Sequence, residues 1–241
     1  MTDPQKASGG IALWRQIADG IRLDIIGGKL NPGDRLPSEA LLAQRYSANR
    51  HTVRRALAVL AEEHVVVAEQ GRGTFVRDIK RLSYPIGKRT RFRDGLKGQA
   101  ETLVTRILNA SMGTGTERVD NALELPAKVQ YVRLDTVSIA DGVPVSRSTT
   151  WVQASRFPDF AERVERLKSI TQVFESYGVL DYSRVSTRIS ARQADVAEAQ
   201  DLHLAPGAVV LVSEAVDVDP QGIPLSYALS RFPAERLELV V

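Results

Sequence analysis

The stretch from Asn49 to Leu57, Asn-Arg-His-Thr-Val-Arg-Arg-Ala-Leu, constrains the fold of this chain more than any other. A helix turning about 100° per residue gathers four apolar side chains on one narrow face: Val53, Ala56, Leu57 and Leu60. The opposite arc gathers four basic or ring side chains: Arg50, His51, Arg54 and Arg55. Asn49 suits the N-cap, because its side chain can accept from a free backbone N–H of the first turn. The pattern therefore predicts a helix that is buried on one side and basic on the other.

A second short helix is expected directly before this one. Ser38 is a capping residue, Leu41 and Leu42 face inward, and residues 46–48 make the turn between the helices. Two helices at this spacing are typical of a helix-turn-helix. An ordinary amphipathic helix with a solvated charged face would show the same stripe, so the flanking residues have to decide between these interpretations.

The flanks favour a protein that reads DNA. Apolar residues at helical spacing run from Leu13 to Ile25, and Gly27-Gly28 ends that helix. Short β-prone runs at residues 65–67 and 74–76 enclose Gln70-Gly71-Arg72-Gly73, which reads as a hairpin tip. The glycines let the tip approach a phosphate or the minor groove, and Arg72 supplies positive charge. Three helices followed by a basic hairpin predict a winged helix-turn-helix that binds double-stranded DNA.

Length and charge predict two domains with different partners. The 241 residues suffice for two modest cores. Residues 1–84 hold 13 Lys and Arg against 9 Asp and Glu, a net charge of +4, whereas residues 85–241 hold 19 against 20, a net charge of −1. We expect a DNA-binding domain over 1–77, a basic linker over 78–92, and an effector-binding and dimerisation domain over 93–241.

Several classes of protein are disfavoured by composition. The chain has no cysteine, which excludes disulfides and thiolate metal sites and suits a reducing cytoplasm. Its three histidines are far apart, so neither a metal nor a cofactor is expected. No apolar run approaches membrane-spanning length, and the first ten residues are polar, so we expect no membrane association and no signal peptide.

The second domain contains an internal repeat. Residues 122–126, Ala-Leu-Glu-Leu-Pro, recur at 201–206 as Asp-Leu-His-Leu-Ala-Pro, and Asp141-Gly-Val-Pro-Val-Ser recurs as Gln221-Gly-Ile-Pro-Leu-Ser. Each unit reads as a short helix, a strand, a glycine turn and a second strand. The repeat predicts an α+β domain, an antiparallel sheet with packed helices and a pseudo-two-fold axis. A cleft between the two halves is the expected ligand site.

Three N-terminal motifs resemble the GntR family of bacterial repressors. They are Gly33-Asp-Arg-Leu-Pro-Ser-Glu39, Asn49-Arg-His-Thr-Val-Arg54 and Gln70-Gly-Arg-Gly-Thr-Phe-Val76. The resemblance implies DNA contacts by Arg50, Thr52, Arg54 and Gly71. Many relatives carry an arginine where this chain has Ala40, so that contact is not carried over. The full expected DNA-binding set is Ser38, Arg50, His51, Thr52, Arg54, Arg55, Gln70, Gly71 and Arg72.

From Pro85 onward the chain resembles the effector domain of the HutC branch of this family, which implies a chorismate-lyase-like fold and a homodimer. Residues 187–192 look most like the PhnF-type regulators of phosphonate metabolism. Members that sense sugar phosphates use a backbone loop matching Phe92-Arg93 and glutamates matching Ser148 and Ser226. Because both glutamates are absent here, an anionic ligand with fewer hydroxyls than an amino-sugar phosphate is expected.

The run from Arg184 to Arg192 alternates arginine with hydroxyl residues on one face of a strand. Arginine forks bind phosphonate or phosphate well, although a half-solvated strand with its charges in water fits the same pattern. The expected effector-binding set is Arg91, Phe92, Arg93, Arg133, Ser148, Arg188, Arg192 and Ser226.

These observations predict a ligand-responsive repressor of phosphonate uptake or degradation genes, released from its operator by a small anionic metabolite. A HutC-branch regulator that senses a histidine-pathway or sugar-related metabolite is the main alternative. A lyase-like enzyme fused to a DNA-binding domain is disfavoured, because the sequence has no Ser-His-Asp arrangement and no glycine-rich phosphate loop. An architectural DNA-binding protein is disfavoured by the near-neutral second domain.

Overall fold

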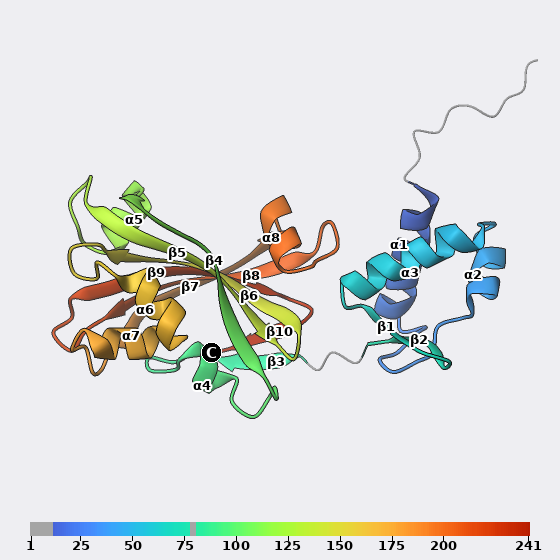
Figure 1. Ribbon diagram of the computed structural model, residues 1–241, viewed down its shortest axis with the longest axis horizontal. Helices are drawn as coiled ribbons and strands as arrows, with labels where there is room; N and C mark the ends of the chain where they lie inside the picture. Colours follow the sequence, from blue (N-terminus) through green and yellow to red (C-terminus); the bar gives the residue numbers. More distant parts are fainter. Residues whose placement is uncertain (1–11, 78–80) are drawn as a thin grey trace, which may run out of the picture. The chain divides into compact units, whose positions relative to one another are not determined.

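A computed structural model describes residues 12–77 and 81–241 of the chain, which divides into two compact units between residues 79 and 80 (Figure 1). Each unit is described by itself. Within the described residues, no helix is both long enough and apolar enough to cross a membrane.

The first unit has the winged helix-turn-helix architecture expected from the sequence. Its elements are α1 (Leu13–Ile26), α2 (Glu39–Arg45), α3 (Arg50–Glu62), β1 (Val66–Glu69) and β2 (Gly73–Val76). Strands β1 and β2 pair antiparallel and form the wing, and Leu36 adds a backbone hydrogen bond to Thr74 at 2.8 Å. The apolar faces of the three helices meet in one core, in which Ile17, Leu42 and Val53 are fully buried.

The helix starts are determined by the capping residues predicted above. The Ser38 side chain accepts from the backbone N–H of Leu41 at 3.3 Å, at the start of α2. Asn49 accepts from the backbone N–H of Thr52 at 2.8 Å, at the start of α3. Each cap satisfies a donor that the first helical turn would otherwise leave unpaired. The two caps therefore determine where both helices of the helix-turn-helix begin.

The second unit is built on a six-stranded antiparallel sheet in the order β4-β5-β6-β9-β8-β7. The strands are β4 (Leu103–Thr114), β5 (Gln130–Ala140), β6 (Val143–Gln153), β7 (Ser183–Gln193), β8 (Val209–Val218) and β9 (Pro224–Pro233). Strands β6 and β9 are paired at the centre, and β4 and β7 form the edges. The two sequence repeats therefore meet along the middle of one sheet, as the pseudo-two-fold predicts.

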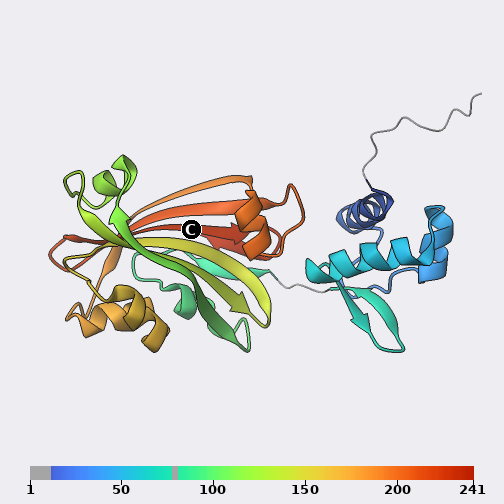
Figure 2. The same ribbon diagram turned by 45° about the horizontal axis from the view of Figure 1, so that its top comes forward.

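Helices cover both faces of this sheet (Figures 1 and 2). Helices α6 (Phe160–Leu167) and α7 (Ile170–Ser176) pack on the face that carries Val132 and Leu134, called the near face here. Helices α5 (Glu117–Ala122) and α8 (Val196–Asp201) pack on the opposite face, called the far face. Because successive residues of a strand point to opposite faces, β5 supplies both cores at once.

The expected linker 78–92 is shorter in the structure. Residues 78–80, like residues 1–11 of the expected DNA-binding domain, lie outside the described residues. Residues Leu82–Pro85 form β3, which pairs in parallel with β10 (Leu237–Val240) near the end of the chain. Leu82 and Tyr84 are buried in a cluster with Phe232, so this segment belongs to the second unit. The short helix α4 (Phe92–Gly95) follows it.

Candidate DNA interface and effector pocket

Helix α3 presents its basic arc to solvent, with Arg50, His51 and Arg54 all exposed. The Arg54 side chain is 64% exposed, and its Nε lies 2.9 Å from Oε2 and 3.1 Å from Oε1 of Glu39. This ion pair bridges the two helices of the helix-turn-helix. It uses only Nε, whereas a bidentate contact to guanine can be made by the Nη groups. Glu39 therefore orients Arg54 without using the atoms that would read a base.

Other members of the expected DNA-binding set make contacts inside the unit. The Thr52 hydroxyl donates to Asn49 at 2.9 Å, and Ser38 caps α2. The Arg55 guanidinium lies 4.8 Å from the centre of the Trp14 ring. A base or phosphate contact by Thr52 or Arg55 would therefore have to compete with an existing interaction.

The wing tip has the geometry expected of an exposed glycine turn. Gly71 has φ +76°, and a Cβ added there would meet nothing within 4 Å. Arg72 pairs with Glu69 and lies 5.5 Å from the centre of the Phe75 ring, while Gln70 is exposed. Gly71 is thus needed for its positive φ, a conformation that costs other residues free energy, and not to avoid a clash within the chain.

A cavity of about 630 Å³ opens on the near face of the second unit. It lies between the sheet, the segment around α4, and helices α6 and α7. The described strands contribute nine serine and threonine side chains to its floor: Thr105, Thr136, Ser138, Ser146, Ser148, Thr150, Ser213, Ser226 and Ser230. Some bond to one another, as Ser148 does to Ser230 at 2.8 Å. Since a hydroxyl both donates and accepts, this floor suits a polar ligand.

Charged side chains enter the cavity from its helical walls. Arg91 stacks on Tyr182, with its guanidinium carbon 3.4 Å from the ring centre, and donates to the Tyr182 carbonyl. Arg93 donates to the carbonyl of Lys168 at 3.3 Å, which joins the α4 segment to the α6–α7 turn. Three acidic residues also line these walls: Asp94, Glu165 and Glu175. The walls therefore present both signs of charge.

The structure brings together five of the eight expected effector residues. Arg91, Phe92, Arg93, Ser148 and Ser226 all line the cavity. The other three lie elsewhere, which corrects the expected set. Arg133 lies on the far face, where it pairs with Asp135 at 3.1 Å and its guanidinium carbon is 5.9 Å from the centre of the Trp151 ring. Arg188 and Arg192 are also outside the cavity, for a reason that lies in the strand pairing.

A β-bulge breaks the alternation expected along β7. Arg184 lies opposite Asp217 of β8, and Arg188 lies opposite Glu214. A step of four residues on one strand thus matches a step of three on the other, which reverses the facing of every later residue. Arg184 therefore lines the near-face cavity, whereas Arg188 and Arg192 belong to the far face.

A pair of charges lies on the cavity floor: Arg184, named above in the alternating run, and Asp217, which the sequence pattern did not indicate. Both are largely buried, with side chains 17% and 14% exposed, and their Nε and Oδ1 atoms are 3.7 Å apart. Burial raises the pKa of Asp217, while the charges of Arg184 and Arg91 act in the opposite direction. The sequence signal was weak, because β8 holds a second acidic residue, Glu214, besides Asp217.

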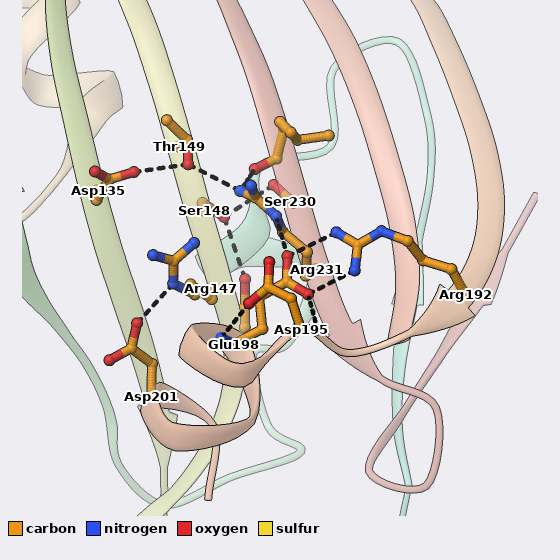
Figure 3. A network of polar contacts seen from close by, with 12 residues as sticks. Asp135, Arg147, Ser148, Thr149, Arg192, Asp195, Glu198, Asp201, Ser230 and Arg231 are labelled. Atoms are coloured by element: carbon orange, nitrogen blue, oxygen red, sulfur yellow. Dashed lines mark hydrogen bonds and ion pairs between the residues drawn. The ribbon is translucent and has the colours of Figure 1, made fainter. Parts of the chain in front are cut away.

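A network of charged side chains, centred on a buried carboxylate, connects the far face to α8 (Figure 3). Arg192 binds Glu198 with both Nη groups, at 2.6 and 2.7 Å, and Arg231 binds the same carboxylate through Nε at 3.0 Å. Arg231 also donates to Thr149 at 2.8 Å, and Thr149 donates to Asp135 at 2.7 Å. The contacts join four strands and one helix.

Glu198 is the centre of this network and is fully buried. Burial alone would raise its pKa, but hydrogen bonds from Arg192 and from the backbone of Asp195, with the charges of Arg192 and Arg231, lower the pKa to about 2. Arg192, one of the arginines expected to bind the effector, is thus committed to holding α8 on the sheet.

Both units match known protein families. The model described as "Bacterial regulatory proteins, gntR family" matches residues 13–76, and that of the UTRA domain matches residues 98–238. The chain is 44% identical over 230 residues to the HTH-type transcriptional regulator RB1450 of Rhizobium meliloti (strain 1021), covering 95% of this chain and 94% of that protein. It is 31% identical over 152 residues to the mannosyl-D-glycerate transport/metabolism system repressor MngR of Escherichia coli (strain K12), covering 63% of each. The crystal structure of PhnF from Mycobacterium smegmatis superposes with a TM-score of 0.63 at 24% identity, covering 92% of this chain and 97% of that one.

Proposed function

Since this chain belongs to the GntR family of bacterial regulatory proteins and carries a UTRA domain, we propose that it is a transcriptional repressor whose hold on DNA is controlled by a small anionic metabolite. The observation that carries the proposal is the near-face cavity, with Arg91 and Arg93 in its walls and hydroxyls across its floor. A guanidinium binds phosphonate, phosphate or carboxylate through a planar pair of donors. Genes for phosphonate uptake or degradation are the proposed targets, on the sequence resemblance of residues 187–192.

DNA recognition is assigned to α3 and the wing. Arg50 and Arg54 lie one helical turn apart on the exposed arc, and the wing tip around Gly71 would contact the backbone or the minor groove. We propose a homodimer that binds a pseudo-palindromic operator in the cytoplasm, because two-fold symmetry in the protein matches two half-sites. Ligand binding would change the spacing of the two DNA-binding domains in the dimer and so lower the affinity for DNA.

A second candidate effector is a sugar-related acid. The nine hydroxyls on the cavity floor favour it, because hydroxyl side chains exchange hydrogen bonds readily with a polyol. The MngR relative, whose name refers to mannosyl-D-glycerate, supports the same class. If the effector belongs to this class, the regulated genes differ from those proposed above, but the ligand releases the protein from DNA in the same way.

The proposal can be tested by measuring DNA affinity with and without ligands. A binding site selected from random duplex DNA would be titrated by fluorescence anisotropy at fixed salt, since affinity for DNA depends steeply on ionic strength. We expect one of phosphate, 2-aminoethylphosphonate or mannosylglycerate to weaken binding at least tenfold. By linkage, the same compound must bind the free protein more tightly than the DNA complex, by the same factor. Release by neutral or cationic metabolites alone would contradict an anionic effector.

A further inference from the structure

Arg184 and Asp217 differ from every other strand residue that lines the described cavity, because they alone carry charge. They sit directly opposite each other on β7 and β8, and Asp217 in turn sits opposite Ser226 of β9. Strand pairing is irregular immediately after both residues, between Arg184 and Ser186 and between Asp217 and Val218. Bulges of this kind often re-aim a side chain toward a functional site.

The pair is arranged poorly for a structural ion pair. The Nε of Arg184 and the Oδ1 of Asp217 are 3.7 Å apart, which is too long for a hydrogen bond. Both atoms are buried, and neither has a hydrogen-bond partner among the described residues. Leaving such groups unsatisfied is costly, so their place on a cavity floor calls for an occupant.

The two atoms are complementary in what they require. The Arg184 Nε carries a proton to donate, and the Asp217 Oδ1 can only accept. A hydroxyl between them would accept from Nε–H and donate to Oδ1 at the same time. An ammonium group can only donate, and it would add positive charge beside Arg184 and Arg91, both of which already act on Asp217. A methyl group would satisfy neither atom.

We propose that Arg184 and Asp217 form a hydroxyl-reading subsite, so that the effector is an acid that also carries a hydroxyl group. This inference rests on the proposed function, in which the acid group binds toward Arg91 and Arg93. In the ligand-free protein a water can take the place of the hydroxyl, and a ligand hydroxyl displaces it without losing its hydrogen bonds. A ligand lacking the hydroxyl must leave both atoms unsatisfied or keep the water.

The test compares matched ligands on the full-length protein by calorimetry. The probes are 2-hydroxyethylphosphonate, 2-aminoethylphosphonate and propylphosphonate, which place OH, NH₃⁺ or CH₃ at the same position. sn-Glycerol 3-phosphate and propyl phosphate repeat the comparison for a phosphate ester. We expect the hydroxyl compound of each series to bind at least tenfold more tightly than its methyl counterpart, with the ammonium compound between them. Asp217→Asn should reduce this preference to about twofold or less.

A second measurement separates ligand reading from a structural role. Without ligand, Asp217→Asn should melt at the same temperature as the wild type or higher, because burial disfavours the charged carboxylate and its Oδ1 has no hydrogen-bond partner among the described residues. The control Glu162→Gln makes the same charge change at an exposed position of α6 and should alter neither Tm nor ligand preference. A clearly lower Tm for Asp217→Asn would make the pair structural and overturn the inference.

The outcomes distinguish this inference from the proposed function. Equal binding of hydroxyl and methyl probes to the wild type would overturn the hydroxyl subsite and leave an anionic effector standing. A hydroxyl preference that persists in Asp217→Asn would assign the reading to the serine and threonine floor instead. Failure of every probe to bind would overturn the anionic effector and, with it, this inference.

Discussion

The two units of the protein use arginine in opposite ways. On the proposed DNA-binding surface the side chains of Arg54 and Arg72 are 64% and 73% exposed, whereas in the sheet domain those of Arg231 and Arg236 are 10% and 0% exposed. Exposed ion pairs contribute little to stability, and breaking a buried one is expensive. Substitutions of these exposed arginines should therefore affect DNA affinity, and substitutions of the buried ones should affect folding.

The two halves of the sheet sharpen this contrast. Helices α5 and α8 occupy equivalent places in the repeat, and both are followed by a buried leucine, Leu123 or Leu202. Val119 faces the sheet from α5 and is 2% exposed, while Glu198 faces it from α8 and is 0% exposed. The same fold thus docks one helix through an apolar side chain and the other through a charge network. The ion-pair network is a feature of α8 and not a requirement of the architecture.

The largest effect is expected from breaking the network at its centre. Glu198→Gln removes the charge that holds Arg192 and Arg231 and leaves the buried Arg231 guanidinium without the carboxylate that it pairs with. The free energy of unfolding of the second unit should fall by about 3–5 kcal/mol, measured by urea denaturation. Exposed Glu162→Gln is the control and should change it by less than about 0.5 kcal/mol. Equal effects of the two substitutions would remove the contrast between buried and exposed charges.

The contribution of the Glu198 carboxylate to stability should also depend on pH. The pKa of Glu198 is lowered from an ordinary value of 4.5 to about 2, so its contribution to stability is present above pH 4.5 and lost as the pH falls to about 2. The loss across this window is at most about 3 kcal/mol. The difference in unfolding free energy between wild type and Glu198→Gln, measured from pH 6 to 2, should shrink accordingly. A difference independent of pH would mean that Glu198 acts through packing and not through charge.

On the DNA side, Arg54→Ala should weaken binding to the selected operator by roughly ten- to a hundredfold, because a bidentate contact to guanine is worth about 1–3 kcal/mol. Binding to random duplex DNA should change much less, and so should Tm. Arg188→Ala removes an exposed arginine from the other unit and is the matched control. Equal losses on operator and random DNA would show that Arg54 contacts only phosphate.

A smaller effect, roughly tenfold on operator affinity, is expected for Gly71→Val. The positive φ at Gly71 costs a side-chain-bearing residue about 1–2 kcal/mol, and the added bulk would keep the tip away from DNA. Gly222→Val is a close match, since Gly222 has φ +81° and equally open surroundings in the second unit. Both variants should lose similar stability, but only Gly71→Val should lose DNA affinity. Normal operator binding by Gly71→Val would take the wing out of the interface.

Local patterns in the sequence were enough to predict the winged helix-turn-helix and the repeated sheet. Capping by Ser38 and Asn49, the apolar stripe of α3 and the glycine turn at Gly71 all act within a few residues, so periodicity and turn chemistry report them directly. Ser148 was expected at the ligand site from the family resemblance, which matched it to a ligand-binding position, and it lines the cavity.

Contacts between distant segments decided the rest. The bulge after Arg184 moves Arg188 and Arg192 to the far face, and nothing in the alternating sequence marks it, since it arises from how β7 pairs with β8. The pairing of β3 with β10 joins segments about 150 residues apart and turns part of a predicted linker into sheet. Glu198 lies on a short helix and is buried by its contact with Arg231 of β9, which lies 33 residues further along the chain. Periodicity determines which faces a segment has, but register and burial depend on partners that only the folded chain brings together.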